Sequence, residues 1–379
     1  MIRRRDMILI GAAARKTGKT AYACRIIARE SKVRDVTGLK ITPWPDGTHE
    51  SVPPDADRST YRIIEETDSS PATDTGRMLA AGARRSFRLL ADRAHVAEGV
   101  AALIQRIQEP ACLVAEGNSA RQAVEPGLFI LLKDPRGDEK DSFRELAHLA
   151  DRVIKAEGSG WDPGPEDCLF LDGEWMLKPR ASAVILAGGD SRRMGRDKSL
   201  LPVSGRPMIA HIADRLKGLF DDIVISGGQP GDYGFLGLDV VADEIAGRGP
   251  LMGIASALER TKNDLTFVIA CDIPDFERGL VARLAERAEG YDAVLPANAR
   301  GELEPVHAFY RKSIIAPARD LLAAGSRSIL DLLPRVRTRT VRLPEGIEIR
   351  NINTEEDYRN LFDGGIGERG PWLRPQRGR

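Results

Sequence analysis

Residues 183–199, AVILAGGDSRRMGRDKS, decide the fold expected for the second half of this 379-residue chain. Five apolar residues lead directly into Gly188 and Gly189, and basic residues that include Arg193 and Lys198 follow. A short apolar run that ends in glycine is typical of a buried strand that opens into a loop. This loop is either an ordinary charged turn or a loop whose backbone amides hold phosphate.

The length and composition of the chain narrow the choices. A chain of 379 residues exceeds what one hydrophobic core usually organises, so two domains are expected. Its 56 basic and 56 acidic residues cancel, which argues against nucleic acid or an anionic membrane as a partner. No segment approaches the roughly 20 apolar residues of a membrane span. The four cysteines are far apart and form no CxxC pair, which favours a reducing cytoplasm over a disulfide or zinc framework.

The first half alternates predicted strands with predicted helices, which is typical of a parallel sheet. Its residues 43–60 are rich in Pro, Asp and Ser and predict a loop. The predicted strands are 7–10, 36–41, 111–117 and 128–133, and the predicted helices are 19–31 and 76–107.

A change of composition marks the domain boundary. The segment EGSGWDPGPED (157–167) has the composition of a linker, and CLFLDGEWML (168–177) follows it. Asp172 and Gly173 suit a type I′ turn, so the second segment predicts a β-hairpin. We therefore expect one domain over 1–180, a second over 181–362 and a disordered tail over 363–379.

The second half repeats the alternation of strands and helices. Its predicted strands are 183–187, 223–226, 239–241, 266–270 and 292–295, and its predicted helices are 207–220, 250–261 and 277–289. Both halves begin with a strand, a glycine loop and a helix.

Two acids of the second half follow predicted strands. In FVIACDIPDF (267–276) an apolar strand ends at Asp272, and the carboxyl end of a parallel strand is the usual place for a magnesium ligand in a nucleotide site. The alternative is that Asp272 caps a turn. Asp243 also follows a strand and precedes a glycine loop and a helix.

The order of these motifs resembles the molybdenum cofactor guanylyltransferases, relatives of the sugar nucleotidyltransferases. The motifs are LAGGDSRRMGRDKSLL with SGRPMI, VADEIAGRGPLMG, ACDIP, EPVHAFY, AGSRSILDLL and RNINTEED, over about residues 182–362. The resemblance implies a Rossmann-like nucleotidyltransferase domain. Its reaction would be attack by the terminal phosphate of molybdopterin or Mo-molybdopterin on the α-phosphate of GTP, with release of pyrophosphate.

The resemblance also implies roles for individual residues. Lys198 would face the phosphates, with Arg193 as additional fixed charge, and Asp272 would bind both GTP and Mg²⁺. Ser226 stands where relatives can carry an asparagine, and Gly227 and Gly228 follow it. Asn351 and Asn353 are either part of the site or turn residues. The residues expected to bind GTP are Leu186, Ala187, Gly188, Gly189, Lys198, Ser226, Asp243 and Asp272.

The start of the chain carries a second candidate phosphate loop. MILIGAAARKTGKTAYACRII (7–27) has the form strand, loop, GKT, helix. Gly18 and its neighbours would cradle phosphates, Lys19 would reach the outer ones, and the hydroxyl of Thr20 would meet Mg²⁺. The usual pattern has glycine where Ala13 stands, and the alternative is a helix start that binds no nucleotide. Glu116 is either a second acid near the metal or a strand-end acid without a ligand.

This half resembles the P-loop GTP-binding adaptor of molybdopterin guanine dinucleotide synthesis. The resemblance rests on the GKT loop, Lys40 in GLKIT, DTGRMLAAGA (74–83) and VAEG (114–117), over about residues 7–135. Together, the two resemblances predict an α/β protein with two three-layer α/β/α domains, a P-loop domain followed by a nucleotidyltransferase.

Other functions stay open at this point. A cytidylyltransferase acting on the same cofactor and a sugar-phosphate nucleotidyltransferase are alternatives, although LAGG, rather than the LAAG common among cytidylyl enzymes, favours guanine. A non-catalytic GTP-binding cofactor carrier is an alternative of another class. Molybdoenzymes or their chaperones are candidate recipients of the product.

Overall fold

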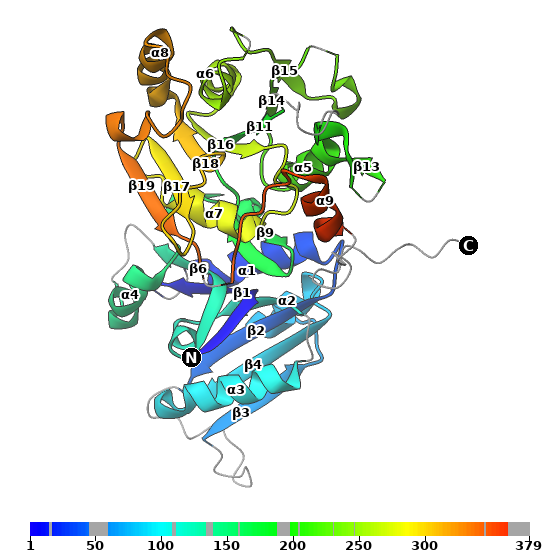
Figure 1. Ribbon diagram of the computed structural model, residues 1–379. Helices are drawn as coiled ribbons and strands as arrows, with labels where there is room; N and C mark the ends of the chain where they lie inside the picture. Colours follow the sequence, from blue (N-terminus) through cyan, green and yellow to red (C-terminus); the bar gives the residue numbers. More distant parts are fainter. Residues whose placement is uncertain are drawn as a thin grey trace, which may run out of the picture. The chain divides into compact units, whose positions relative to one another are not determined.

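The computed structural model describes residues 1–14, 17–44, 60–107, 111–133, 139–157, 160–187, 198–203, 205–229, 231–245, 247–344 and 346–362. The chain divides into two compact units, Met1–Leu177 and Lys178–Arg379, each with its own large sheet (Figure 1). The tail expected over 363–379 lies outside the described residues. Among the helices of the described ranges, none has both the length and the apolar composition that crossing a bilayer requires.

The first unit is organised around an eight-stranded sheet. Its strands are β1 (Ile2–Ala12), β2 (Val36–Pro43), β3 (Tyr61–Glu66), β4 (Arg85–Ala91), β5 (Cys112–Glu116), β6 (Val124–Lys133), β7 (Arg152–Glu157) and β8 (Gly160–Trp161). They lie in the order β3-β4-β2-β5-β1-β6-β7-β8, and all neighbours are parallel except the two edge pairs, β3 with β4 and β7 with β8. The sheet therefore places the carboxyl ends of β2, β5 and β1 side by side.

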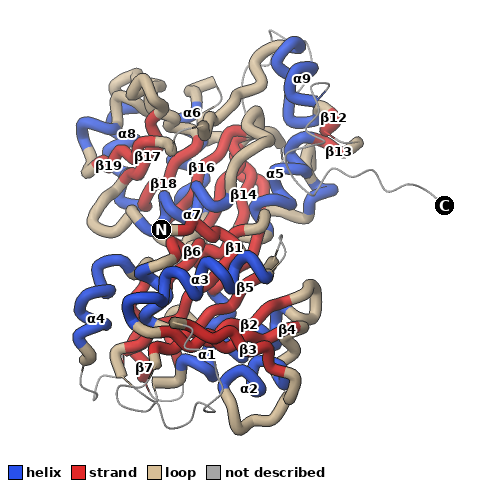
Figure 2. The backbone as a smooth tube through the Cα atoms, turned by 90° about the horizontal axis from the view of Figure 1, so that it is seen from below, coloured by secondary structure: helices blue, strands red, loops and turns tan. Residues whose placement is uncertain are grey.

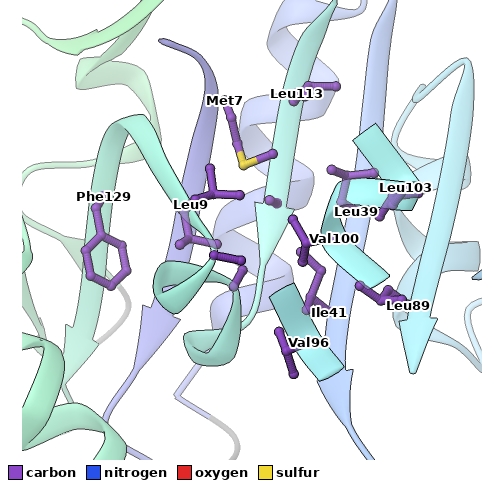
Figure 3. Close-up of a cluster of buried hydrophobic side chains, with 14 of the residues drawn as sticks. Met7, Leu9, Leu39, Ile41, Leu89, Val96, Val100, Leu103, Leu113 and Phe129 are labelled. Carbon is purple, nitrogen blue, oxygen red and sulfur yellow. The ribbon is translucent and has the colours of Figure 1, made fainter. Parts of the chain in front are cut away.

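Alternate residues of β1 face opposite sides of this sheet. Met7 and Leu9 belong to the core on one face, shown in Figure 3 with Val96 and Val100 of the covering helix. Ile8 and the residues in register with it belong to the core on the other face. Helices thus cover both faces of a mainly parallel sheet: α3 (Val96–Arg106) and α4 (Asp141–Leu146) on the first, α1 (Lys19–Glu30) and α2 (Asp74–Ala80) on the second.

The helix predicted over 76–107 is wrong. Residues 74–80 and 96–106 are helical, but a strand, β4, lies between them and pairs with β2 and β3. Phe87, Leu89 and Ala91 are fully buried at a spacing of two, as a strand requires. Phe87, Leu90 and Ala91 also have the spacing of an apolar helix face, so the outcome depends on the strands that pair with β4.

The hairpin predicted at Asp172-Gly173 is confirmed. Strands β9 (Cys168–Leu171) and β10 (Glu174–Leu177) pair antiparallel, with Leu171 opposite Glu174. Asp172 has φ of 54° and Gly173 has φ of 80°. A type I′ turn requires positive φ at both central residues, and Asp-Gly tolerates this conformation.

The second unit contains a seven-stranded sheet. Its strands are β11 (Ser182–Leu186), β14 (Ile223–Ser226), β15 (Asp239–Val241), β16 (Leu265–Ala270), β17 (Ala293–Ala297), β18 (His307–Arg311) and β19 (Thr338–Arg342). In the order β15-β14-β11-β16-β18-β17-β19, only β18 runs antiparallel to its neighbours. β18 and β19 were not among the predicted strands. A separate two-stranded sheet pairs β12 (Pro202–Val203) with β13 (Arg206–Pro207).

Helices cover both faces of this sheet as well (Figures 1 and 2). The core of one face joins Val184 and Val268 with α6 (Pro250–Arg260) and α8 (Ile315–Ala323). The other face carries α5 (Met208–Lys217) and α7 (Arg278–Glu286). A last helix, α9 (Glu355–Phe362), follows the segment that contains RNINTEED. Both units are therefore mixed α/β structures with mainly parallel sheets.

Candidate functional site

The site of the second unit starts where three parallel strands end. In the sheet, Leu186 of β11 is in register with Ser226 of β14 and with Ala270 of β16. The amide of Ala187 donates to the carbonyl of Ser226 at 2.8 Å, and the amide of Cys271 donates to the carbonyl of Leu186 at 3.0 Å. The loops that carry the predicted site residues therefore leave the sheet side by side.

The structure brings the predicted pair Lys198 and Asp272 together. Lys198 begins a short 3-10 turn, and its Nζ lies 3.9 Å from Oδ2 of Asp272. The same Nζ donates to the carbonyl of Ile352 at 3.1 Å and to Oδ1 of Asn353 at 3.4 Å. The amide of Ile352 in turn donates to the carbonyl of Asp272 at 2.8 Å. The main chain of Ile352 therefore joins the lysine to the loop of the acid.

The segment around Ile352 has its own anchors. The side chain of Ile352 is buried, with 1% of its surface exposed. On its far side, the carboxylate of Asp357 accepts the amides of Asn353 and Thr354, and the hydroxyl of Thr354 accepts the amide of Asp357. This reciprocal cap fixes the start of α9 and with it the direction in which the carbonyl of Ile352 points.

Burial raises the pKa of Asp272, and the charge of Lys198 opposes this effect. A carboxylate that has lost part of its water is stabilised by a nearby cation. Magnesium is usually bound through one or two carboxylates together with phosphate oxygens, so Asp272 fits the role predicted for it.

A second acid, Asp243, offers an acceptor to a ligand. Its Oδ1 is buried and has no hydrogen-bond partner among the described residues, and burial raises the pKa of its carboxyl group. A Cβ added to Gly253 of α6 would lie 2.8 Å from Oγ of Ser226 and 3.3 Å from Oδ1 of Asp243. The hydroxyl of Ser226 donates to the carbonyl of Gly253 at 3.0 Å, so it is already engaged. The unpaired oxygen of Asp243 is thus the stronger candidate for a nucleoside contact.

The remaining predicted residues of this site, Gly188, Gly189 and Arg193, lie outside the described residues. Gly253 and Ile352 were missed as site residues. Gly253 ends the motif VADEIAGRGPLMG and lies in the helix predicted over 250–261, where a glycine side chain offers no chemical group. Ile352 contributes its main-chain carbonyl and amide. Nearly every residue type has these groups, so the side chain gives no indication of this role.

The first unit holds another cluster of charged side chains, at the start of α1. Gly18 has φ of 87° and immediately precedes the helix. Burial lowers the pKa of Lys19, and the nearby charges of Lys40 and Lys140 lower it further, while Glu116 opposes them. A partly buried ammonium group at a helix N-terminus is well placed to meet phosphate.

Thr20 of this cluster lies between two carboxylates. Its Oγ1 is 2.9 Å from Oε2 of Glu116 and 3.0 Å from Oδ1 of Asp74. The hydroxyl of Thr20 has one hydrogen, so it can donate to only one of the two carboxylate oxygens at a time. A hard cation could contact all three oxygens, so it fits this face of the cluster better than a further hydrogen bond does. The described residues contain no group of three or more His, Cys, Asp or Glu suited to a metal, so phosphate oxygens would have to complete the coordination.

Glu116 therefore lies beside the threonine predicted to meet the metal. Asp74 was missed, because an acid that follows Thr73 at the first position of a helix reads as part of a cap. The place of Asp74 in the cluster follows from the sheet, because the pairing of β2 with β4 and β5 brings α2 to this end of it.

Comparisons with known proteins match the second unit. Residues 183–339 match the MobA-like NTP transferase domain. A probable molybdenum cofactor guanylyltransferase of Carboxydothermus hydrogenoformans is 34% identical over 48% of this chain and 94% of its own length. The corresponding protein of Pelotomaculum thermopropionicum is 40% identical over 47% and 90%. A solved structure, molybdopterin-guanine dinucleotide biosynthesis protein A of Archaeoglobus fulgidus, covers 48% of this chain and 97% of its own, with 23% identity and a TM-score of 0.43.

These relatives align with the second unit over nearly their whole length, and that unit brings together the lysine and the acid at the ends of its parallel strands. Through this unit the chain belongs to the molybdenum cofactor guanylyltransferase family, and the protein is a nucleotidyltransferase.

Proposed function

We propose that the second unit transfers GMP from GTP to molybdopterin or Mo-molybdopterin. A terminal phosphate oxygen of the acceptor forms a bond to the α-phosphorus of GTP. The bond between that phosphorus and the oxygen that bridges it to the β-phosphate breaks, and pyrophosphate leaves with this oxygen. The support for these substrates is the name that the relatives carry, molybdenum cofactor guanylyltransferase.

One observation carries the assignment to a site: Lys198, Asp272 and the main chain of Ile352 form a single connected group. Phosphoryl-type transfer depends mainly on positioning and on neutralising charge. Lys198 would neutralise phosphate, and Asp272 would hold Mg²⁺, which supplies further neutralisation when bound. Asp243 would accept a hydrogen bond from the nucleoside.

The rest of the proposed site follows the family motif. Leu186 and Ala187 would line the nucleotide, because they end β11 at the edge where the other site residues lie. Gly188, Gly189 and Arg193 would add backbone amides and charge. Ser226 remains a proposed GTP-binding residue. Its hydroxyl already donates a hydrogen bond to a main-chain carbonyl of α6, that of Gly253.

The test is a pyrophosphate assay on the full chain with molybdopterin, Mg²⁺ and GTP, CTP or ATP. We expect GTP to be preferred and Asp272→Asn to lower the rate by at least about 100-fold. Preference for CTP would replace the guanylyl assignment with a cytidylyl one. Binding of GTP without pyrophosphate release would favour the non-catalytic carrier.

We further propose that the first unit binds GTP through Gly18, Lys19 and Thr20, with Mg²⁺ at Thr20. The support is the positive-φ glycine before α1, the partly buried lysine that follows it and the oxygen-rich face at Thr20. The unit would then act as an adaptor joined to the enzyme. The test is calorimetry with GTP in the Lys198→Met background, which removes the phosphate contact of the second unit. Loss of GTP binding on Lys19→Met would support GTP binding by the first unit, and unchanged binding would contradict it.

The two proposals together place the protein in molybdenum cofactor biosynthesis in the cytoplasm, with molybdoenzymes or their chaperones as recipients. A pull-down of the full chain with apo-molybdoenzymes, with and without GTP, tests the last step.

A further inference from the structure

A closed ring of four side chains lies at the proposed GTP site of the first unit. Thr20 contacts Asp74 and Glu116, as described above. Nζ of Lys40 lies 2.5 Å from Oε1 of Glu116 and 2.7 Å from Oδ2 of Asp74. Each carboxylate therefore uses one oxygen for the threonine and the other for the lysine.

The fold fixes this ring in place. Lys40 of β2 is in register with Glu116 of β5, on neighbouring parallel strands. The side chain of Glu116 is 1% exposed and that of Lys40 is 17% exposed. The ammonium group thus sits on a rigid sheet and is largely shielded from water, so its bonds to the carboxylates are little weakened by solvent.

Lys40 carries its charge in this setting. Burial alone would lower its pKa, but Glu116 and then Asp74 outweigh burial and the pKa of Lys40 is raised. The pKa of Asp74 is lowered despite its partial burial, because Lys40 and Thr20 stabilise the ionised form. The carboxylates that face Thr20 therefore already hold one cation.

The positive charges around the site already offset its two carboxylates. Lys19, Lys40 and Arg77, whose Nη1 lies 3.9 Å from Oδ1 of Asp74, oppose Asp74 and Glu116. A divalent ion that entered alone would therefore leave an excess of positive charge in a largely buried place. A triphosphate that entered with the ion would supply the missing negative charge and a new partner for the displaced ammonium group.

We propose that Lys40 is a tethered cation that competes with the divalent ion for Asp74 and Glu116, so that metal and nucleotide bind to the first unit only together. This inference rests on the proposed GTP binding of that unit. Lys40 is thereby a positioning residue: it keeps the two carboxylates in place and releases them when phosphate arrives.

The experiment is a titration of the full chain with Mn²⁺ alone, followed by electron paramagnetic resonance, in the Asp272→Asn background so that the second unit does not contribute. We expect Lys40→Met to bind Mn²⁺ at least about tenfold more tightly than the parent. Lys40→Arg, which keeps the charge, should bind as weakly as the parent. Lys133→Met is the matched control, since Lys133 is also a lysine of a strand in this sheet and pairs with a carboxylate, that of Glu139. Equal Mn²⁺ affinity of Lys40→Met and the parent overturns the proposal.

A second measurement needs no substitution at Lys40. In a chain with Asp272→Asn and Lys198→Met, the affinity for Mn²⁺ is compared with and without GTP, after correction for the Mn²⁺–GTP complex that forms in solution, and we expect GTP to increase it by at least about tenfold. An affinity that GTP leaves unchanged, although GTP binds, overturns the role of Lys40. Failure of GTP to bind the first unit at all contradicts the proposed function instead, and the Mn²⁺ titration without nucleotide still decides the role of Lys40.

Discussion

At the scale of single residues, main-chain atoms hold the side chains to which we assign the transfer chemistry of the second unit. The ammonium group of Lys198 bonds to a carbonyl, and the loop of Asp272 is tied to the same residue, Ile352. Backbone partners are stiffer than side chains, so the geometry of the lysine is defined before a substrate binds.

Replacing Lys198 by Met should lower pyrophosphate release by at least about 100-fold, because one fixed positive charge is lost where charge develops in the reaction. The fold should persist, since only a partly buried charge is removed. Lys262→Met is the control, as that side chain is 81% exposed. A rate within about threefold of the wild type would exclude the role given to Lys198.

His307 makes the stability of the second unit sensitive to acid. Both ring nitrogens are buried without hydrogen-bond partners among the described residues, and burial lowers the pKa of His307 to about 3. The unfolded chain binds this proton near pH 6.5 and the folded chain does not, so stability is present above that pH and is lost as the pH falls towards 3.

Between pH 7.5 and pH 5, this effect should cost about 2 kcal/mol. Unfolding followed by circular dichroism at both pH values should show a smaller loss for His307→Phe than for the wild type. Equal losses would mean that His307 does not titrate on unfolding in this range.

At the scale of elements, the site depends on how closely α6 approaches the ends of β11 and β14. Gly253 allows this approach, because a Cβ there would lie 2.8 Å from the hydroxyl of Ser226 and 3.5 Å from the side chain of Leu186. The helix and the strand ends must separate to accept even one methyl group.

Gly253→Ala should therefore displace Asp243 and Leu186 from a bound nucleotide. We expect KM for GTP to rise by about tenfold with a smaller change in kcat, because nucleoside binding rather than phosphate chemistry is disturbed. Ala257→Gly, on the same helix, is the control for a change of helix propensity. A fall in kcat with KM unchanged would contradict this reading of Gly253.

The elements that the sequence predicted correctly are those whose signal is local. Strand β11 is an apolar run that glycines follow in the sequence, and the hairpin at Asp172 has its turn residues in place, so short stretches suffice. The prediction at β4 was wrong, because Phe87, Leu90 and Ala91 fit a helical spacing while Phe87, Leu89 and Ala91 fit a strand spacing. The neighbours that make it a strand lie some distance along the chain.

The same limit applies to the candidate sites. Lys198, Asp272 and Thr20 stand in motifs with a chemical meaning and were predicted by residue type. Ile352 and Asp74 also stand in quoted motifs, but the contacts of the Ile352 main chain and of the Asp74 carboxylate depend on strand pairing and on helix capping.

At the scale of the whole molecule, the chain contains two units, each with its own sheet and buried cores. Each carries a lysine near the end of its first strand, Lys19 in one and Lys198 in the other, and both are proposed to meet phosphate. Since each unit has its own core, the two nucleotide sites should be separable by substitution.

Calorimetry with GTP and Mg²⁺ should therefore find about two sites per wild-type chain and about one in Lys19→Met. Pyrophosphate release by Lys19→Met, with molybdopterin in excess, should stay within about twofold of the wild type, because the transfer site is intact. A single site in the wild type would remove the nucleotide function of the first unit.

The position of Ile352 along the chain has a consequence for synthesis on the ribosome. Every described strand of the second sheet, the last of them β19, leaves the ribosome before the residue that holds Lys198. A nascent chain can therefore pair its strands while the lysine is still without its carbonyl partner. Truncation of the message after β19 would then yield a folded sheet whose proposed transfer site lacks this carbonyl, so we expect activity to be acquired only after residue 352 has been synthesised.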